Sequence, residues 1–154
     1  MPTTKTFPAL VDYSLTLEEM LSKCNFDGID ENITSRNFSI HGTGRVVIEV
    51  IATQFNQHII TSEEVIDRIS SMGYRPAMIE EFLAVRWKDA VWEDECTIIC
   101  LGSVCTPYGT FVIERIPCVN VRGEQQFLSL SGRDRSRWLG KRCHFACIPI
   151  VKGI

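Results

Sequence analysis

The chain has 154 residues, of which 45% are hydrophobic and 23% are charged, and its formal net charge is −3. A chain of this length can bury roughly 70% of its unfolded surface in one core, so we expect a single globular domain over residues 1–154. No apolar run approaches the roughly 20 residues that span a bilayer, and the first residues lack the apolar stretch of a secretory signal. The sequence therefore predicts a cytoplasmic protein with no membrane segment.

The N-terminal third predicts a surface arm, one helix and one strand. Residues 1–13 contain two prolines and little periodicity, which indicates an arm laid on the surface. A short helix is expected over residues 15–24, where Thr16 and Glu19 have the spacing of a capping box. Residues 45–55 are rich in β-branched side chains and predict a strand. One face of that strand is wholly apolar and should meet the helices.

Residues 61–87 predict a pair of helices. Thr61 and Glu64 form a second capping-box pair, followed by apolar residues at helical spacing. Gly73 suits the left-handed position that ends a helix, and Pro76 suits the first turn of the next one. We therefore expect a helical pair at the centre of the chain.

The second half of the chain predicts strands. The expected strands cover residues 96–104, 110–116, 118–121, 126–130 and 143–151. The order is a short helix and a strand, then a central helix pair, then a β-rich half. This order favours an α+β fold with an antiparallel or mixed sheet.

Seven cysteines are expected to be reduced and buried, because they lie in apolar segments and no signal peptide precedes them. Six of them lie in or beside the expected strands: Cys96, Cys100, Cys105, Cys118, Cys143 and Cys147. Two pairs are four residues apart, but on a strand such residues are separated by roughly 13 Å and cannot share a zinc ion. No glycine-rich phosphate loop precedes a helix. We therefore expect neither a metal nor a cofactor.

Two further patterns bear on catalysis. Cys105 could meet His144, His41 or His58 in space, which leaves a cysteine-nucleophile enzyme with a Cys–His pair as an alternative function. The carboxylates at Glu80-Glu81 and at residues 93–95 are interpreted as solvated faces. No catalytic motif supports an enzyme, so we expect that the protein is not one.

The segment 131–142 is chemically the most distinctive. Its candidate binding residues are five basic side chains around one tryptophan: Arg133, Arg135, Arg137, Trp138, Lys141 and Arg142. Guanidinium groups pair with anions and an indole offers a stacking face. Residues 61–95 carry a net charge of −5 and residues 96–154 carry +5, so this loop could instead bind the acidic segment of its own chain. An acidic protein surface is the expected partner, and we do not expect nucleic acid as the partner, because the whole chain is acidic.

The motif G-x-R-P-A…E-x-L at residues 73–83 resembles one in short uncharacterised bacterial and phage proteins. Residues 99–103 (ICLGS) are similar to their A-L-G-S strand, and Trp138, Arg142, Phe145 and Ala146 are similar to their terminal strand. The resemblance covers about the last two thirds of the chain and implies no particular activity. More distantly, the helix and the terminal strand are similar to C-type-lectin-like folds. The chain lacks their calcium-binding carboxylates, so this similarity implies neither sugar nor calcium binding.

These observations predict a small protein that acts by binding another protein through its basic, tryptophan-containing loop. The cysteine-nucleophile enzyme is the first alternative, and a nucleic-acid binder is the second. The oligomeric state does not follow from the sequence.

Overall fold

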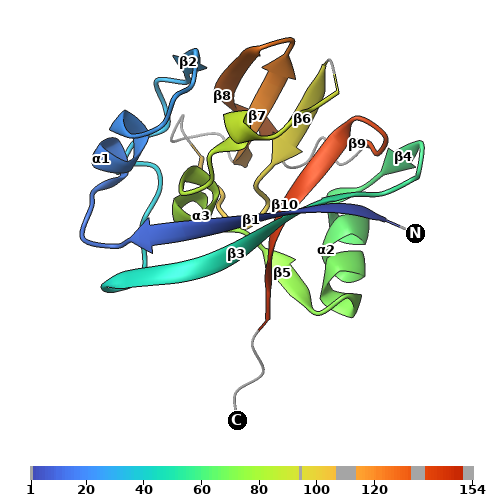
Figure 1. Ribbon diagram of the computed structural model, residues 1–154, viewed down its shortest axis with the longest axis horizontal. Coiled ribbons are helices and arrows are strands. Elements are labelled where there is room, and N and C mark those ends of the chain that lie inside the picture. Colours follow the sequence, from blue (N-terminus) through green and yellow to red (C-terminus); the bar gives the residue numbers. More distant parts are fainter. Residues whose placement is uncertain (1, 94, 107–113, 133–137, 151–154) are drawn as a thin grey trace.

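The computed structural model describes residues 2–93, 95–106, 114–132 and 138–150 (Figure 1). A mixed eight-stranded sheet dominates it, in the order β1-β3-β10-β6-β7-β8-β2, with β5 paired to β10. The strands of this sheet are β1 (Thr3–Asp12), β2 (Gly28–Ile29), β3 (Arg45–Gln54), β5 (Tyr74–Pro76), β6 (Cys96–Ile99), β7 (Arg115–Arg122), β8 (Gln125–Gly132) and β10 (Cys143–Pro149). Two short strands, β4 (Ile59–Ile60) and β9 (Trp138–Leu139), form a separate antiparallel ribbon.

The helices are short. They are α1 (Leu17–Ser22), α2 (Ser62–Ser71) and α3 (Ile79–Leu83), together with a 3₁₀ turn, η1, over Trp87–Asp89. The predicted α+β fold with a central helix pair is therefore wrong, and the described chain is mostly β. The second helix of that pair is shorter than expected. Pro76 ends strand β5, where it lies opposite Cys147 of β10, and α3 begins only at Ile79.

Both sequence-predicted capping boxes are present. Thr16 and Glu19 exchange hydrogen bonds at the start of α1, and Thr61 and Glu64 do the same at the start of α2. Gly73 follows α2 with a φ of 84°, in the left-handed region that the helix stop requires. These local features could be predicted from the sequence because each depends only on residues three or four positions apart.

The predicted N-terminal arm is wrong, because residues 3–12 form strand β1. This strand pairs antiparallel with β3 along its whole length, from Thr3 opposite Gln54 to Asp12 opposite Arg45. Pro8 is tolerated because β1 is an edge strand, on which a missing backbone N–H need not break a ladder. The side chains of Ala9 and Val11 are buried, so the segment has the alternating pattern of a strand despite its prolines.

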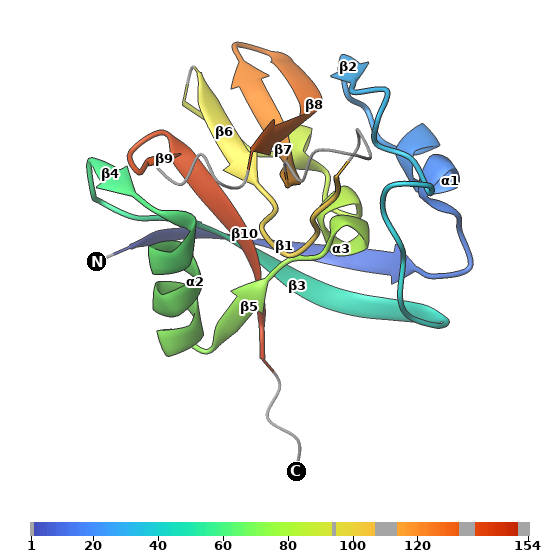
Figure 2. The ribbon, with the colours of Figure 1, turned by 180° about the vertical axis from the view of Figure 1, so that it is seen from behind.

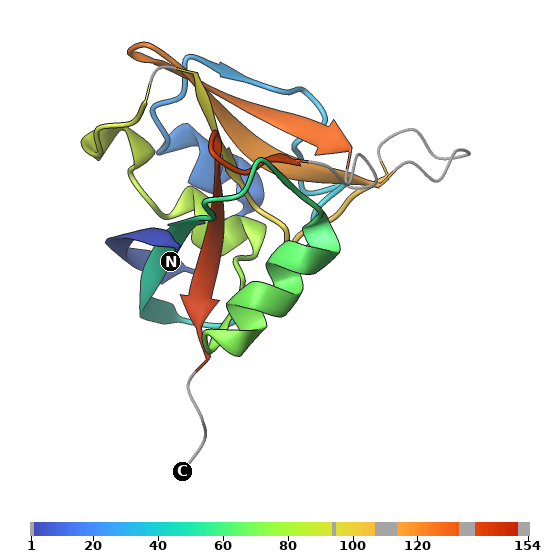
Figure 3. The same cartoon turned by 90° about the vertical axis from the view of Figure 1, so that its right-hand side faces the viewer.

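Strand β10 is an interior strand with three partners in the sheet. It pairs antiparallel with β3 and β5 and parallel with β6 (Figures 1 and 2). Phe145 and Cys147 point into a core beneath α2, while Ala146 and Ile148 point into the core that contains α1 and α3. Figure 3 shows α2 beside β10. Residues of α2 belong to the core of Phe145 and Cys147, whereas residues of α1 and α3 belong to the core on the other face. Side chains of β10 therefore pack on both faces of the sheet.

All seven cysteines are free thiols, and six are buried, as the sequence predicted for those six. Cys24, which was also expected to be buried, is only half-buried. Among the described residues, no helix is long and apolar enough to cross a membrane.

Candidate functional site

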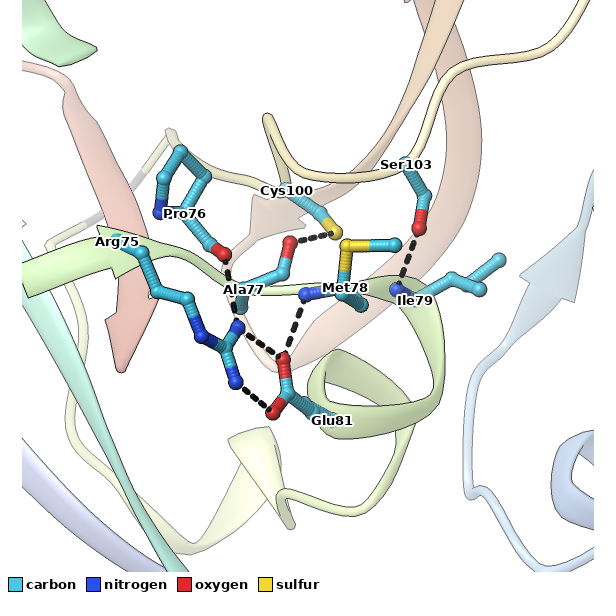
Figure 4. Close-up of polar contacts among 8 residues, drawn as sticks. All are labelled: Arg75, Pro76, Ala77, Met78, Ile79, Glu81, Cys100 and Ser103. Atoms are coloured by element: carbon cyan, nitrogen blue, oxygen red, sulfur yellow. Dashed lines mark hydrogen bonds and ion pairs between the residues drawn. The ribbon is translucent and has the colours of Figure 1, made fainter. Parts of the chain in front are cut away.

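The start of α3 is held by a network of hydrogen bonds (Figure 4). Ser103 Oγ accepts a hydrogen bond of 2.7 Å from the Ile79 amide, and the Cys100 thiol donates to the Ala77 carbonyl over 3.1 Å. The Gly102 amide also donates to that carbonyl. A Cβ atom on Gly102 would lie 2.3 Å from the Ala77 oxygen, so only glycine allows this approach. The segment after β6 thereby fixes where α3 begins.

Glu81 anchors the same helix from its first turn. Its carboxylate accepts two hydrogen bonds from the Arg75 guanidinium, of 2.8 and 2.7 Å, and one of 2.9 Å from the Met78 amide (Figure 4). Only about 4% of the Glu81 side chain is exposed. The predicted solvated face at Glu80 and Glu81 is therefore wrong, because both side chains are buried.

A cavity of about 730 Å³ lies between α1, the end of β1 and the segment that follows α3. Its apolar wall includes Leu15, Met20, Leu83, Val85 and Trp87. Four basic residues line it, Lys23 among them, and three of the four are in ion pairs within the protein: Arg45 with Asp12, Arg86 with Asp89 and Lys88 with Asp27. A volume of this size suits a small organic ligand.

Two buried polar residues, Glu80 and Gln126, also line this cavity. They are 3% and 4% exposed. Within the described part of the chain, neither Oε2 of Glu80 nor Oε1 of Gln126 has a hydrogen-bond partner. An unsatisfied buried acceptor costs about 1–3 kcal/mol, so both oxygens favour a donor that the described residues do not supply.

Electrostatics distinguish Glu80 from the other acids at the cavity. Burial, more than any other cause, raises the pKa of the Glu80 carboxyl, and the charge of Glu81 adds to this effect. In contrast, hydrogen bonds from Ser14 lower the pKa of Asp12 at the edge. A bound cation would favour the ionised form of Glu80 and offset the cost of its burial.

A second group of polar side chains comes from three segments on the same face of the sheet. His144 Nε2 lies 3.1 Å from Glu93 Oε2, and one ligand atom each of Glu93, Cys96 and His144 lie within 4.8 Å of one another. Cysteine pairs along one strand are too far apart to share a zinc ion, whereas this group combines side chains from different segments. The sequence did not predict it because it depends on the parallel register of β6 and β10.

The predicted binding loop is only partly described. Arg133, Arg135 and Arg137 lie outside the described residues. Trp138 is half-buried, donates its indole N–H to Ser62 Oγ over 2.9 Å, and packs edge-on against Phe145. Lys141 and Arg142 are exposed, and Arg142 lies 3.8 Å from Glu95 in an ion pair exposed to solvent.

The thiols are poorly suited to nucleophilic chemistry. Burial raises the pKa of every one of the seven, for example to about 11 at Cys105, the predicted nucleophile. Two of the histidines suggested as its base, His41 and His58, are exposed, whereas His144 is buried beside Glu93. The sulfurs of Cys24, Cys100 and Cys147 donate hydrogen bonds to backbone carbonyls. A reactive cysteine needs the opposite, an exposed thiol with a lowered pKa.

Comparison of the chain with protein-family models, with curated proteins and with solved structures finds no match. The resemblances to bacterial and phage proteins and to lectin-like folds therefore stay predictions.

Proposed function

We propose that this protein binds a small organic molecule that has an apolar body and a cationic or other N–H donor group. The observation that carries this proposal is the buried carboxyl of Glu80, which has an unpartnered oxygen and lines the cavity with Gln126. We further propose that the protein works in the cytoplasm, because seven free thiols suit a reducing compartment.

The shape and chemistry of the cavity support a ligand of this class. Aliphatic and aromatic side chains form much of its wall and favour an apolar body. The buried oxygens of Glu80 and Gln126 accept hydrogen bonds and cannot donate them, as long as Glu80 is ionised. An ammonium group would supply N–H donors and a charge opposite to that of Glu80.

Phenethylamine and 3-phenylpropionate test this proposal as a matched cation and anion of similar size. In calorimetric titrations at pH 7, the amine should bind at least about tenfold more tightly than the carboxylate. The reason is that a hydrogen bond to a charged group contributes about 1.5–3 kcal/mol. Equal affinities, or no binding of either compound, would contradict the proposal.

Variants then locate the bound amine. Glu80→Gln should weaken amine binding at least about tenfold, because it removes the charge and keeps the shape. Ala84→Phe should weaken both compounds, since Ala84 lines the cavity. Glu63→Gln is the matched control: Glu63 is an exposed acid on α2, on the other face of the sheet, and its loss should change nothing.

A protein-binding surface is the second candidate function. It is favoured by the ribbon of β4 and β9, where Ile59 and Leu139 lie directly opposite each other and are 41% and 51% exposed. The exposed cations Lys141 and Arg142 follow in the chain. Reversing both charges to glutamate should abolish retention of an acidic partner protein in pull-downs. Reversing the exposed Lys23 and Arg36, near α1, should not.

A further inference from the structure

The geometry points to a second site, in which Glu93, Cys96 and His144 bind a divalent transition-metal ion such as Zn²⁺. This inference is independent of the cavity and of the proposed ligand. It rests on where the fold brings the three side chains together.

The sheet register aligns two of the three ligands. In the parallel pairing of β6 with β10, His144 lies opposite Ile98. Side chains two residues apart on a strand share a face, so Cys96 and Ile98 point to the same side as His144. His144 is 2% exposed and Cys96 is 3% exposed. Two ligands are therefore fixed by strands before any ion binds.

Glu93 supplies the third ligand from the segment that precedes β6. Its carboxylate lies 3.1 Å from His144 Nε2, and its side chain is 54% exposed. The three ligand atoms lie within 4.8 Å of one another. Bonds of about 2.0–2.3 Å around one tetrahedral ion place ligand atoms roughly 3.3–3.8 Å apart. The exposed carboxylate can make most of this adjustment.

The ligand set fits the chemistry of zinc. Thiolate, imidazole and carboxylate are the three side-chain types that zinc binds, and three protein ligands leave a fourth position for water. Trp92 packs edge-on against the His144 ring, with centroids 4.8 Å apart, and its indole N–H is held by the Trp87 carbonyl. This contact limits the rotation of the imidazole.

The charged and titratable groups around the site have opposing effects. Burial and the nearby Glu93 carboxylate raise the pKa of Cys96 to about 11, and a bound dication would reverse this by stabilising the thiolate. Burial lowers the pKa of His144, which keeps the imidazole neutral and able to bind a metal. Lys5 opposes a cation: its ammonium bonds the Val91 carbonyl and lies 4.7 Å from the centre of the Trp92 ring.

Isothermal titration of the reduced protein with Zn²⁺ tests the site, with Co²⁺ as a spectroscopic probe. One equivalent of Zn²⁺ should bind, more tightly at pH 8 than at pH 6, because Cys96 must lose its proton. The Co²⁺ complex should show the near-ultraviolet charge-transfer absorption of a cobalt–thiolate bond. Lys5→Gln should raise the affinity, because it removes a repelling charge.

Matched variants identify the ligands. Cys96→Ser should abolish the charge-transfer band and weaken Zn²⁺ binding at least about tenfold. Cys143→Ser is the control, since Cys143 is adjacent to His144 but points into the core beneath α2. Glu93→Gln removes an exposed ligand and keeps the inference testable if Cys96→Ser does not fold. No Zn²⁺ binding, or binding that neither ligand variant weakens, would overturn the site.

Discussion

Glu80 and Glu81 are adjacent in the sequence and almost equally buried, but they differ in their hydrogen-bond partners. Glu81 accepts three hydrogen bonds from Arg75 and Met78, whereas Glu80 has an oxygen without a partner in the described chain. The burial of an acid is costly only when its charge is not compensated. Glu81 therefore stabilises the start of α3, and the ionised form of Glu80 opposes folding.

Replacing each acid by glutamine should change stability in opposite directions. Glu81→Gln should lower the free energy of unfolding by about 2 kcal/mol, because it breaks a charge-assisted pair. Glu80→Gln should raise it at pH 7. The folded protein raises the pKa of Glu80, so the native state loses stability as the pH rises above the unfolded-state value of this carboxyl. Urea unfolding from pH 4 to pH 8 should show the gain of Glu80→Gln growing with pH, and a pH-independent gain would contradict this account.

The sequence could not have shown that both acids are buried. On a helical wheel, Ile79, Phe82 and Leu83 define the apolar stripe, and Glu80 and Glu81 both fall outside it. Their burial comes from Arg75 and from segments distant in the chain. The cluster of Glu93, Cys96 and His144 was not predicted either, because it depends on contacts between distant segments. The register between two strands cannot be read from the residue pattern of one strand.

At the scale of elements, prolines caused both misassignments in the first half of the chain. Pro8 made an edge strand look like an arm, and Pro76 made a short strand look like the first turn of a helix. A proline indicates that a backbone donor is absent and φ is fixed, and an edge strand meets that condition as well as a helix start does. A capping box is a more specific signal than a single proline, because it requires two particular residues at a fixed spacing.

Gly102→Ala should test how closely the segment after β6 approaches β5 and α3. The added methyl would lie 2.3 Å from the Ala77 carbonyl oxygen, a backbone atom that cannot rotate away. We expect a loss of stability of about 2–3 kcal/mol, measured by urea or thermal unfolding. Gly28→Ala is the matched control, because its methyl would meet the Phe127 side chain at 3.0 Å and the ring can shift. Equal effects of the two changes would contradict this account.

At the scale of the whole molecule, the burial of six cysteines was the most successful prediction, because a thiol in an apolar segment behaves as a small hydrophobic side chain. The sulfurs divide between the two cores: Cys96, Cys100 and Cys105 lie in one, and Cys118, Cys143 and Cys147 in the other. The fold class was harder to predict, because sheet order depends on contacts between distant segments.

Alkylation of the native protein should therefore be slow at all seven thiols. The pKa of Cys24, which alone is half-buried, is raised to about 11, so its thiolate fraction at pH 8 is about 100-fold below that of an ordinary thiol. Mass spectrometry should show Cys24 labelled first and the other six labelled only as the protein unfolds. Cys24→Ser should leave no early product, and rapid labelling of a core cysteine would contradict this arrangement.

Strand β10 follows every other described strand in the chain, yet it alone joins β3 to β6. Until β10 is translated, the edge of β3 in the antiparallel pair of β1 and β3 must therefore stay unpaired, and so must the edge of β6 in the meander of β6, β7 and β8. Their union needs contacts of long sequence separation, which form slowly. Ribosome-bound chains that stop before residue 143 should remain sensitive to protease, and native resistance should arise in one late step.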